Sequence, residues 1–182
     1  MSEGIGGIGG LVASRLRDIP DFPEPGILFK DVTPLLADGA AFGAVTRDVA
    51  GRHTTSSGPA VDLVAGIEAR GFIFGAAIAH ELGIGFVPVR KAGKLPGDTI
   101  GVSYDLEYGS ATIEVHADSF EGGKRVLLVD DVLATGGTAA AAWDLIERAG
   151  GTVVGFEAIL ELSFLPGRER LGSRSVHALL TV

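Results

Sequence analysis

The chain has 182 residues, and its 23 acidic and 15 basic side chains give a formal net charge of −8 at pH 7. This length suggests one domain with a sizeable core, and a hydrophobic content of 46% fits an α/β domain. The acidic balance argues against a general nucleic-acid binder, and the lack of cysteine excludes disulfides, thiolate metal ligands and a cysteine nucleophile.

The first ten residues are rich in glycine, and Gly4–Gly9 formally matches the dinucleotide-binding pattern G-x-G-x-x-G. That motif requires a preceding strand, and only three residues precede Gly4, so we expect residues 1–10 to be a flexible terminus. The segment lacks the basic and long apolar regions of a secretory signal. Since no run of about 18 apolar residues exists, we predict a cytoplasmic protein without a membrane span.

Residues 11–182 are expected to form a single domain that starts with a short helix at 11–17. Three prolines then stop this helix and force an extended path. An apolar stretch that ends in lysine follows at 27–30. By pattern alone, this stretch is either a rigid surface loop with an apolar anchor or a small cap over a binding site.

Alternating helices and strands come next, and their spacing predicts parallel strands with right-handed crossovers. We expect helices at 40–53 and 72–82, and strands at 61–67 and 85–89. Only four basic residues lie between His53 and Gly123, and all four follow predicted strands: Arg70, Arg90, Lys91 and Lys94. Their placement indicates a local anion site in an acidic body.

The segment 92–108 is polar, contains several glycines and has no helical period. It is longer than an ordinary connection, so we expect it to be functional or mobile. The alternation at 112–115 is weak and is compatible with a hairpin strand.

The stretch 124–142 combines a buried strand, two carboxylates and a glycine turn before a helix. The apolar run 126–129 is typical of a buried parallel strand, and Asp130 and Asp131 end it. The turn 134–138 then begins a helix that runs to about residue 149. A helix N-terminus favours an anion, while carboxylates suit sugar hydroxyls or a metal. The arrangement predicts a pentose 5-phosphate site; the alternative is an ordinary crossover with a polar end.

The rest of the chain is predicted to complete the sheet. Strands are expected at 152–162 and, as an edge strand, at 176–182, with a short polar segment at 166–171 between them. Competing sites are not supported, because the sequence has no G-x-x-x-x-G-K-[ST] motif and its four histidines have no metal-ligand spacing.

The acids and turn of 130–138 closely resemble the phosphoribosyl-pyrophosphate signature of the type I phosphoribosyltransferases. Four further blocks resemble the adenine phosphoribosyltransferases within that group: 19–34, 66–72, 89–97 and 104–109. The match is collinear from about residue 11 to 165. It implies an open, mostly parallel twisted sheet flanked by helices, with a small N-terminal hood at about 11–36 and a mobile lid at about 92–108.

The resemblance also implies an activity. The phosphoribosyl group of 5-phosphoribosyl 1-pyrophosphate would pass to adenine and give AMP and pyrophosphate. Mg²⁺ would be bound mainly through the substrate, with no direct protein ligands, in a homodimer without nucleic-acid or membrane partners. Two alternatives stay open: a type I phosphoribosyltransferase for another base, and a regulator that senses phosphoribosyl pyrophosphate.

The same resemblance assigns residues to substrate groups. Asp130 and Asp131 would contact the ribose diol. The 5-phosphate would lie in the turn formed by Ala134, Thr135, Gly136, Gly137 and Thr138. Pyrophosphate would be bound by Glu68, Ala69, Arg70, Arg90, Lys91 and Lys94. The segment Glu68-Ala69-Arg70 resembles a loop that often holds a non-proline cis peptide.

Adenine would be recognised in the hood through backbone groups and apolar stacking, by Ile27, Leu28, Phe29 and Lys30. Many relatives have arginine where Lys30 stands, which matters only if the side chain makes the contact. Glu107 resembles the residue proposed to handle the purine proton, and Arg70 is the second expected catalytic residue. The alternative for Glu107 is a solvated loop carboxylate.

Overall fold

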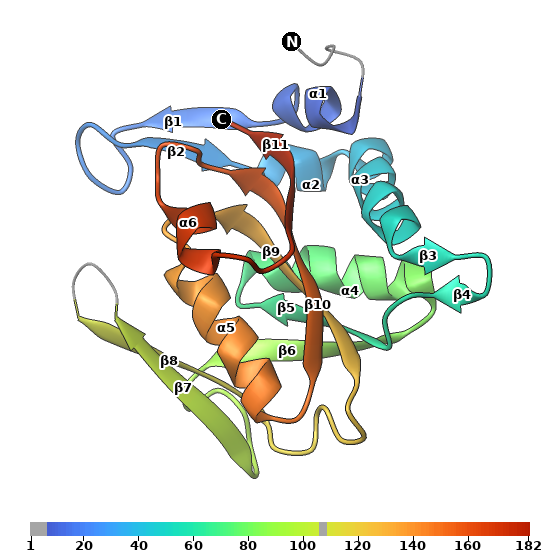
Figure 1. Cartoon of the computed structure of the whole chain (residues 1–182). Helices are drawn as coiled ribbons and strands as arrows, with labels where there is room; N and C mark the ends of the chain where they lie inside the picture. Colours follow the sequence, from blue (N-terminus) through green and yellow to red (C-terminus); the bar gives the residue numbers. More distant parts are fainter. Residues whose placement is uncertain (1–6, 106–108) are drawn as a thin grey trace.

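The computed structural model describes residues 7–105 and 109–182. Its centre is a seven-stranded sheet in the order β11-β10-β9-β5-β6-β8-β7 (Figure 1). The apolar runs read from the sequence form its parallel part, which consists of β5 (Leu63–Ile67), β6 (Gly85–Lys91), β9 (Arg125–Leu133), β10 (Thr152–Glu161) and β11 (Val176–Thr181). An antiparallel hairpin of β7 (Thr99–Asp105) and β8 (Ser110–His116) extends the sheet beside β6.

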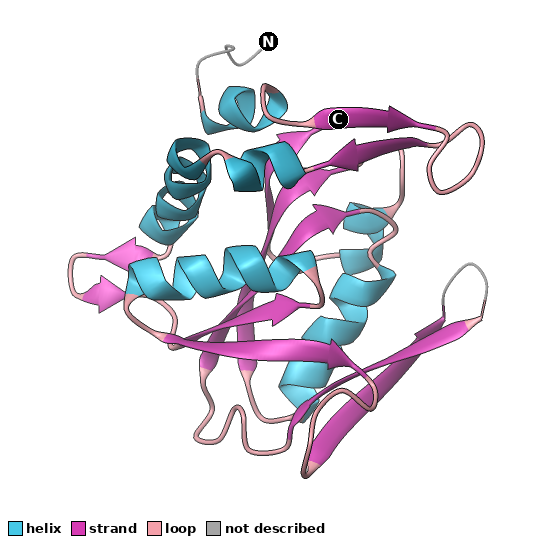
Figure 2. Ribbon diagram, turned by 180° about the vertical axis from the view of Figure 1, so that it is seen from behind, coloured by secondary structure: helices cyan, strands magenta, loops and turns pink. Residues whose placement is uncertain are grey.

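Helices cover both faces of this sheet, as Figure 2 shows. One face packs against α5 (Gly137–Arg148) through Phe120, Trp143 and Phe156. The other packs against α3 (Gly39–Arg52) and α4 (Arg70–Leu82) through residues such as Phe74 and Ile78. Two fully buried apolar clusters therefore hold the strand ends in fixed positions.

The smaller elements lie outside the central sheet. The hood consists of a hairpin of β1 (Arg17–Pro20) and β2 (Leu28–Asp31), with α2 (Thr33–Ala37) after it. The remaining elements are α1 (Ile8–Ala13), the short pair β3 (Thr54–Thr55) and β4 (Gly58–Pro59), and α6 (Gly167–Leu171). None of the helices in the described part of the chain is both long and apolar enough to cross a membrane.

The structure differs from the sequence expectations mainly near the site. The first helix begins at Ile8 and ends at Ala13. Arg17 instead starts a strand, because residues 17–20 pair with β2, and its guanidinium also pairs with Asp31 (Nη2 to Oδ2, 2.6 Å). Part of the predicted lid, Thr99–Asp105, is a strand. Strand β6 continues to Lys91, so Arg90 and Lys91 close a strand rather than open a loop. The expectations for residues 1–6 and 106–108, including Glu107, lie outside the described residues.

Candidate active site

A cavity lies at the carboxyl ends of the parallel strands, where open α/β sheets bind ligands. Its lining includes the hood, Arg70, Asp131 and most of the turn that precedes α5. Asp130 and Gly136 line a smaller recess around the same turn. The structure thus brings the predicted base, ribose and phosphate residues to one place.

The turn Ala134–Thr138, called the phosphate turn here, forms because Gly136 takes a left-handed conformation (φ 76°) at the start of α5. A Cβ atom at Gly136 would lie 2.6 Å from the carbonyl oxygen of Gly167, so the site admits only glycine. The first N–H groups of an α-helix have no partner within the helix. Together with the Thr135 and Thr138 hydroxyls, they can hold a phosphate.

The two adjacent acids have different environments. Asp131 is buried, and one of its carboxylate oxygens accepts a hydrogen bond from the Arg70 guanidinium. Asp130 Oδ1 accepts a hydrogen bond from the Asp131 N–H (2.9 Å). Burial and, secondarily, the Asp131 charge raise the pKa of Asp130 well above its ordinary value. Both side chains carry acceptor oxygens at the end of β9, as a sugar diol requires.

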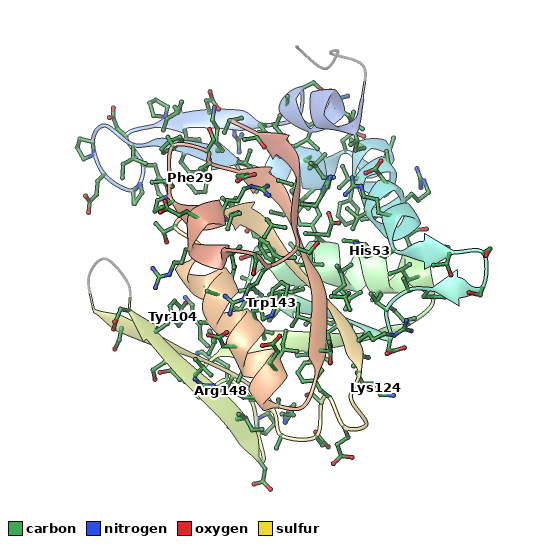
Figure 3. All side chains as sticks on the ribbon, viewed as in Figure 1. Phe29, His53, Tyr104, Lys124, Trp143 and Arg148 are labelled. Atoms are coloured by element: carbon green, nitrogen blue, oxygen red, sulfur yellow. The ribbon has the colours of Figure 1, made fainter. Side chains whose placement is uncertain are left out.

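Arg70 also connects the sheet to the hood. Its Cζ atom lies 5.6 Å from the centroid of the Phe29 ring, within the range of a cation–π contact. Phe29 itself packs edge-on against Phe22, and it lies beneath the hood hairpin in Figure 3. The aromatic side chain that is predicted to contact the base is therefore held by the cation that contacts Asp131.

Ile27, Leu28 and Lys30 complete the predicted adenine site in the hood. Ile27 and Leu28 are about half exposed and line the cavity. The Lys30 ammonium donates to Asp18 Oδ1 across the hairpin (2.7 Å). Since its side chain is engaged there, a contact of Lys30 with a base would use the backbone.

The predicted pyrophosphate residues form a neighbouring group that does not line the main cavity, apart from Arg70. Glu68 Oε2 accepts hydrogen bonds from Arg90 Nε (3.2 Å) and from the Lys91 N–H (3.0 Å). The Lys91 N–H is the main reason that the pKa of Glu68 lies below its ordinary value. Arg90 Nη1 donates to the Lys94 carbonyl (3.1 Å). The expected non-proline cis peptide is present between Glu68 and Ala69.

Several residues of the site were not singled out from the sequence. Tyr104 of β7 contacts Thr138 (hydroxyl to Oγ1, 3.1 Å), and Figure 3 shows it beside α5. Phe164 is 73% exposed and lines the same cavity. Arg170 of α6 also lines it and lies against Gly137. The sequence signals that could have identified them were the aromatic side chains of Tyr104 and Phe164 and the cluster of charges around Arg170.

The carboxylates near the phosphate turn decide whether this site could hold a metal ion. Within residues 7–105 and 109–182, no group of three or more histidine or acidic side chains is arranged to hold a metal ion by itself. Mg²⁺ is commonly bound by one or two carboxylates together with substrate phosphates and water. Asp130 and Asp131 beside the phosphate turn fit such a substrate-dependent site.

Comparison with known proteins places the chain among phosphoribosyltransferases. Residues 33–162 match the family described as phosphoribosyl transferase domain. The adenine phosphoribosyltransferase of Salinispora tropica is 63% identical over 172 residues, which cover 94% of this chain and 90% of the relative. The crystal structure of the Thermoanaerobacter pseudethanolicus adenine phosphoribosyltransferase is 46% identical, with a TM-score of 0.87, and the match covers 94% of this chain and 98% of that one.

A third relative was solved with ligands. The Saccharomyces cerevisiae adenine phosphoribosyltransferase, complexed with an imino-altritol bisphosphate and adenine, is 37% identical, with a TM-score of 0.86 over 95% of this chain and 98% of that one. High identity over nearly the whole length, in both sequence and structure, agrees with the geometry of the cavity. The chain belongs to the adenine phosphoribosyltransferase family.

Proposed function

We propose that this chain transfers the phosphoribosyl group of 5-phosphoribosyl 1-pyrophosphate to adenine and releases AMP and pyrophosphate. The observation that carries the proposal is the single cavity lined by an apolar hood, by Asp131 and by the phosphate turn. Formation of AMP from labelled adenine tests it, with guanine, hypoxanthine and xanthine as competing bases. Preference for an oxopurine would favour the alternative, a type I phosphoribosyltransferase for another base.

The sugar phosphate is bound at the carboxyl ends of the parallel strands. The N–H groups and hydroxyls of the phosphate turn hold the 5-phosphate, and the helix dipole of α5 adds to the attraction. Arg170 supplies a cation beside Gly137, where the turn itself has none. Asp130 and Asp131 accept hydrogen bonds from the ribose diol.

Adenine is bound on the apolar side of the cavity. Ile27, Leu28 and the flat ring of Phe29 offer apolar surface on the hood, and Phe164 offers a second apolar surface. Backbone N–H and C=O groups of the hood form hydrogen bonds with the polar edge of the base. The Lys30 side chain stays with Asp18, so the exchange with the arginine of many relatives has little effect on base recognition.

The leaving group needs fixed positive charge. As the bond to pyrophosphate breaks, C1 of the ribose gains oxocarbenium character and negative charge develops on the diphosphate. Cations that are already in place stabilise this charge without reorganisation. Arg70, Arg90, Lys91 and Lys94 supply them from the chain. Mg²⁺, bound mainly through substrate oxygens, would supply further charge neutralisation.

The lid excludes water, since an open site would hydrolyse the sugar pyrophosphate. Strand β7 reaches the phosphate turn through Tyr104 and Thr138, so its described part already borders the site. Glu107, beyond the end of this strand, is proposed to act on the purine proton as a general base.

The remaining expectations concern partners and location. A homodimer and a cytoplasmic location stay predictions, and sedimentation velocity tests the first. A regulator that binds nucleic acid would need a basic face, whereas the charge of this chain is −8. Salt-dependent binding to duplex DNA at submicromolar affinity would support that alternative.

A further inference from the structure

Glu114 is a buried carboxylate inside a region that must bind an anion. It lies in the middle of β8, opposite Arg90 of β6 on one side and Gly101 of β7 on the other. Only 7% of its surface is exposed. A buried negative charge beside the residues for pyrophosphate would oppose binding unless it organises donors there.

Its contacts show what it organises. Glu114 Oε1 accepts hydrogen bonds from the N–H groups of Lys94 and Leu95, both at 3.0 Å. Thr99 Oγ1 lies 3.5 Å from Oε2. Burial acts to raise the pKa of Glu114, but the N–H groups of Leu95, Gly93 and Lys94 outweigh it and keep the pKa below its ordinary value. Glu114 is therefore ionised at neutral pH and bound by backbone N–H groups.

Among the described ion pairs, none joins Glu114 to a lysine or arginine side chain. Glu114 thus neutralises none of these cations directly, whereas Arg70 pairs with Asp131 and Arg90 pairs with Glu68. Glu68 acts on the preceding residues in a similar way, through the Lys91 N–H and Arg90 Nε. The hydrogen bond from Arg90 Nη1 to the Lys94 carbonyl connects the residues that Glu68 holds to the turn that Glu114 holds.

We propose that Glu114 is a positioning residue for the pyrophosphate site, because it fixes the turn 93–95 and with it the placement of Arg90 and Lys94. This inference rests on the proposed function, in which these cations neutralise the leaving group. Without the carboxylate, the N–H groups of Lys94 and Leu95 lose their charged acceptor and the turn can adopt other conformations. The hydrogen bonds of the Glu114 side chain within the described residues go to Lys94, Leu95 and Thr99 and not to the phosphate turn or the hood, so AMP binding should not depend on it.

The test compares two ligands on the folded protein. Calorimetry measures the affinity of Glu114→Gln for pyrophosphate in the presence of Mg²⁺ and, separately, for AMP. We expect about tenfold weaker pyrophosphate binding, as for the loss of a charge-assisted hydrogen bond, with AMP affinity changed by less than about twofold. Glu114→Asp, which keeps the charge and withdraws it by one methylene, should show the same split and serves where the Gln variant fails to fold.

The matched control is Glu157→Gln. Glu157 is another buried carboxylate, 3% exposed, which pairs with Arg52 and His53 and does not line the cavity. Glu157→Gln should lower the stability of the protein, but it should leave the ratio of pyrophosphate affinity to AMP affinity unchanged. Equal loss of both affinities in the Glu114 variants, or unchanged pyrophosphate binding, would overturn the inference. Failure of the unaltered chain to form AMP would instead contradict the proposed function, and the pyrophosphate measurement would still decide the role of Glu114.

A double-mutant cycle adds a readout that a purely structural role would not move. Lys94→Ala removes one cation that Glu114 is proposed to place. If the two residues act together, the effects of Glu114→Gln and Lys94→Ala on pyrophosphate affinity should be clearly less than additive. Additive effects would show that Glu114 does not act through this turn.

Discussion

The Arg70 guanidinium donates a hydrogen bond to Asp131, 61 residues further along the chain, while it lies over the Phe29 ring. One side chain thus contacts the proposed sites of the ribose, the leaving group and the base. A lysine could keep the charge but has neither the planar face nor the forked donors.

Arg70→Lys should therefore reduce kcat/KM for phosphoribosyl pyrophosphate by about 10-fold to 100-fold, because both the ion pair and the stacking contact weaken. Steady-state kinetics with adenine in excess measure this. Arg15→Lys is the matched control, since Arg15 pairs with Asp38 and does not line the cavity. A variant with wild-type kinetics would mean that Arg70 only supports the fold.

The two adjacent acids should respond differently to amidation. Asp131→Asn should lower kcat/KM by about 10-fold to 100-fold through weaker ribose binding and loss of the Arg70 pair. Asp130→Asn should also lower activity, but the free protein should be at least as stable as wild type at pH 7. The raised pKa of Asp130 means that the fold resists its ionisation, so stability falls as pH rises past its ordinary pKa, and Asn removes that loss.

Thermal unfolding from pH 5 to 8, without ligand, measures this difference. The Asp130→Asn protein should show a flatter dependence of Tm on pH than wild type. A large drop in Tm for Asp130→Asn at pH 7 would contradict a raised pKa. Near-normal kinetics of the double variant would show that the diol contact is misassigned.

Gly136→Ala should disable the phosphate turn. The added Cβ meets the Gly167 carbonyl and the left-handed φ strains alanine, so the turn must shift. A displacement of that kind can cost about 100-fold in kcat/KM. Gly51→Ala in α3 is the control, because its Cβ meets nothing within 4 Å, and it should stabilise the protein by about 0.5–1 kcal/mol. Wild-type affinity of Gly136→Ala for AMP would argue against phosphate binding there.

Asp31 should make the hood sensitive to acid. The Thr33 N–H and hydroxyl, followed by Arg17, lower the pKa of Asp31 to about 2. Because the folded-state pKa is depressed, its stabilisation is present above about pH 4 and is lost as pH falls toward 2. Asp31→Asn should lower the free energy of unfolding at pH 7 by about 1–3 kcal/mol, and this gap should close toward pH 2. Urea denaturation across this range tests it; a gap that is constant with pH would refute the assignment.

Glu107→Gln should reduce turnover more than base affinity, because an amide cannot accept the purine proton yet preserves the size of the side chain. The measurement is kcat and KM for adenine at saturating phosphoribosyl pyrophosphate. Asp118→Asn, in the exposed turn after β8 and outside the cavity lining, is the control for a change of surface charge. A rise in KM with unchanged kcat would point to binding and would favour the solvated-carboxylate alternative.

The parallel part of the sheet could be predicted because its strands are buried on both faces. A continuous apolar run such as Val126–Val129 is buried most easily as a central parallel strand. The acids that follow it show at which end of the strand a ligand would bind. Strand β7 could not be predicted in the same way. Of its seven residues only Val102 is buried, so it has almost no apolar signal, and its strand conformation depends on pairing with β8.

Part of the lining of the candidate site could be predicted from the sequence, but the contacts among its residues could not. Asp131, Arg70 and the phosphate turn follow from local pattern and resemblance. The stacking of Arg70 on Phe29 and the hold of Glu114 on the turn 93–95 depend on tertiary geometry between distant segments. Lys30 is a further case, since its pairing with Asp18 depends on the register of the hood hairpin.

The β7–β8 hairpin joins the parallel sheet where Arg90 lies opposite Glu114 and Lys91 opposite Ile113 in the strand register. The joint is narrow, and on the β6 side it consists of residues that are proposed to bind the leaving group. A swing of the hairpin about this joint would pull on the same backbone. The position of the hairpin and the placement of Arg90 and Lys91 are thus mechanically linked by two paired residues on each strand.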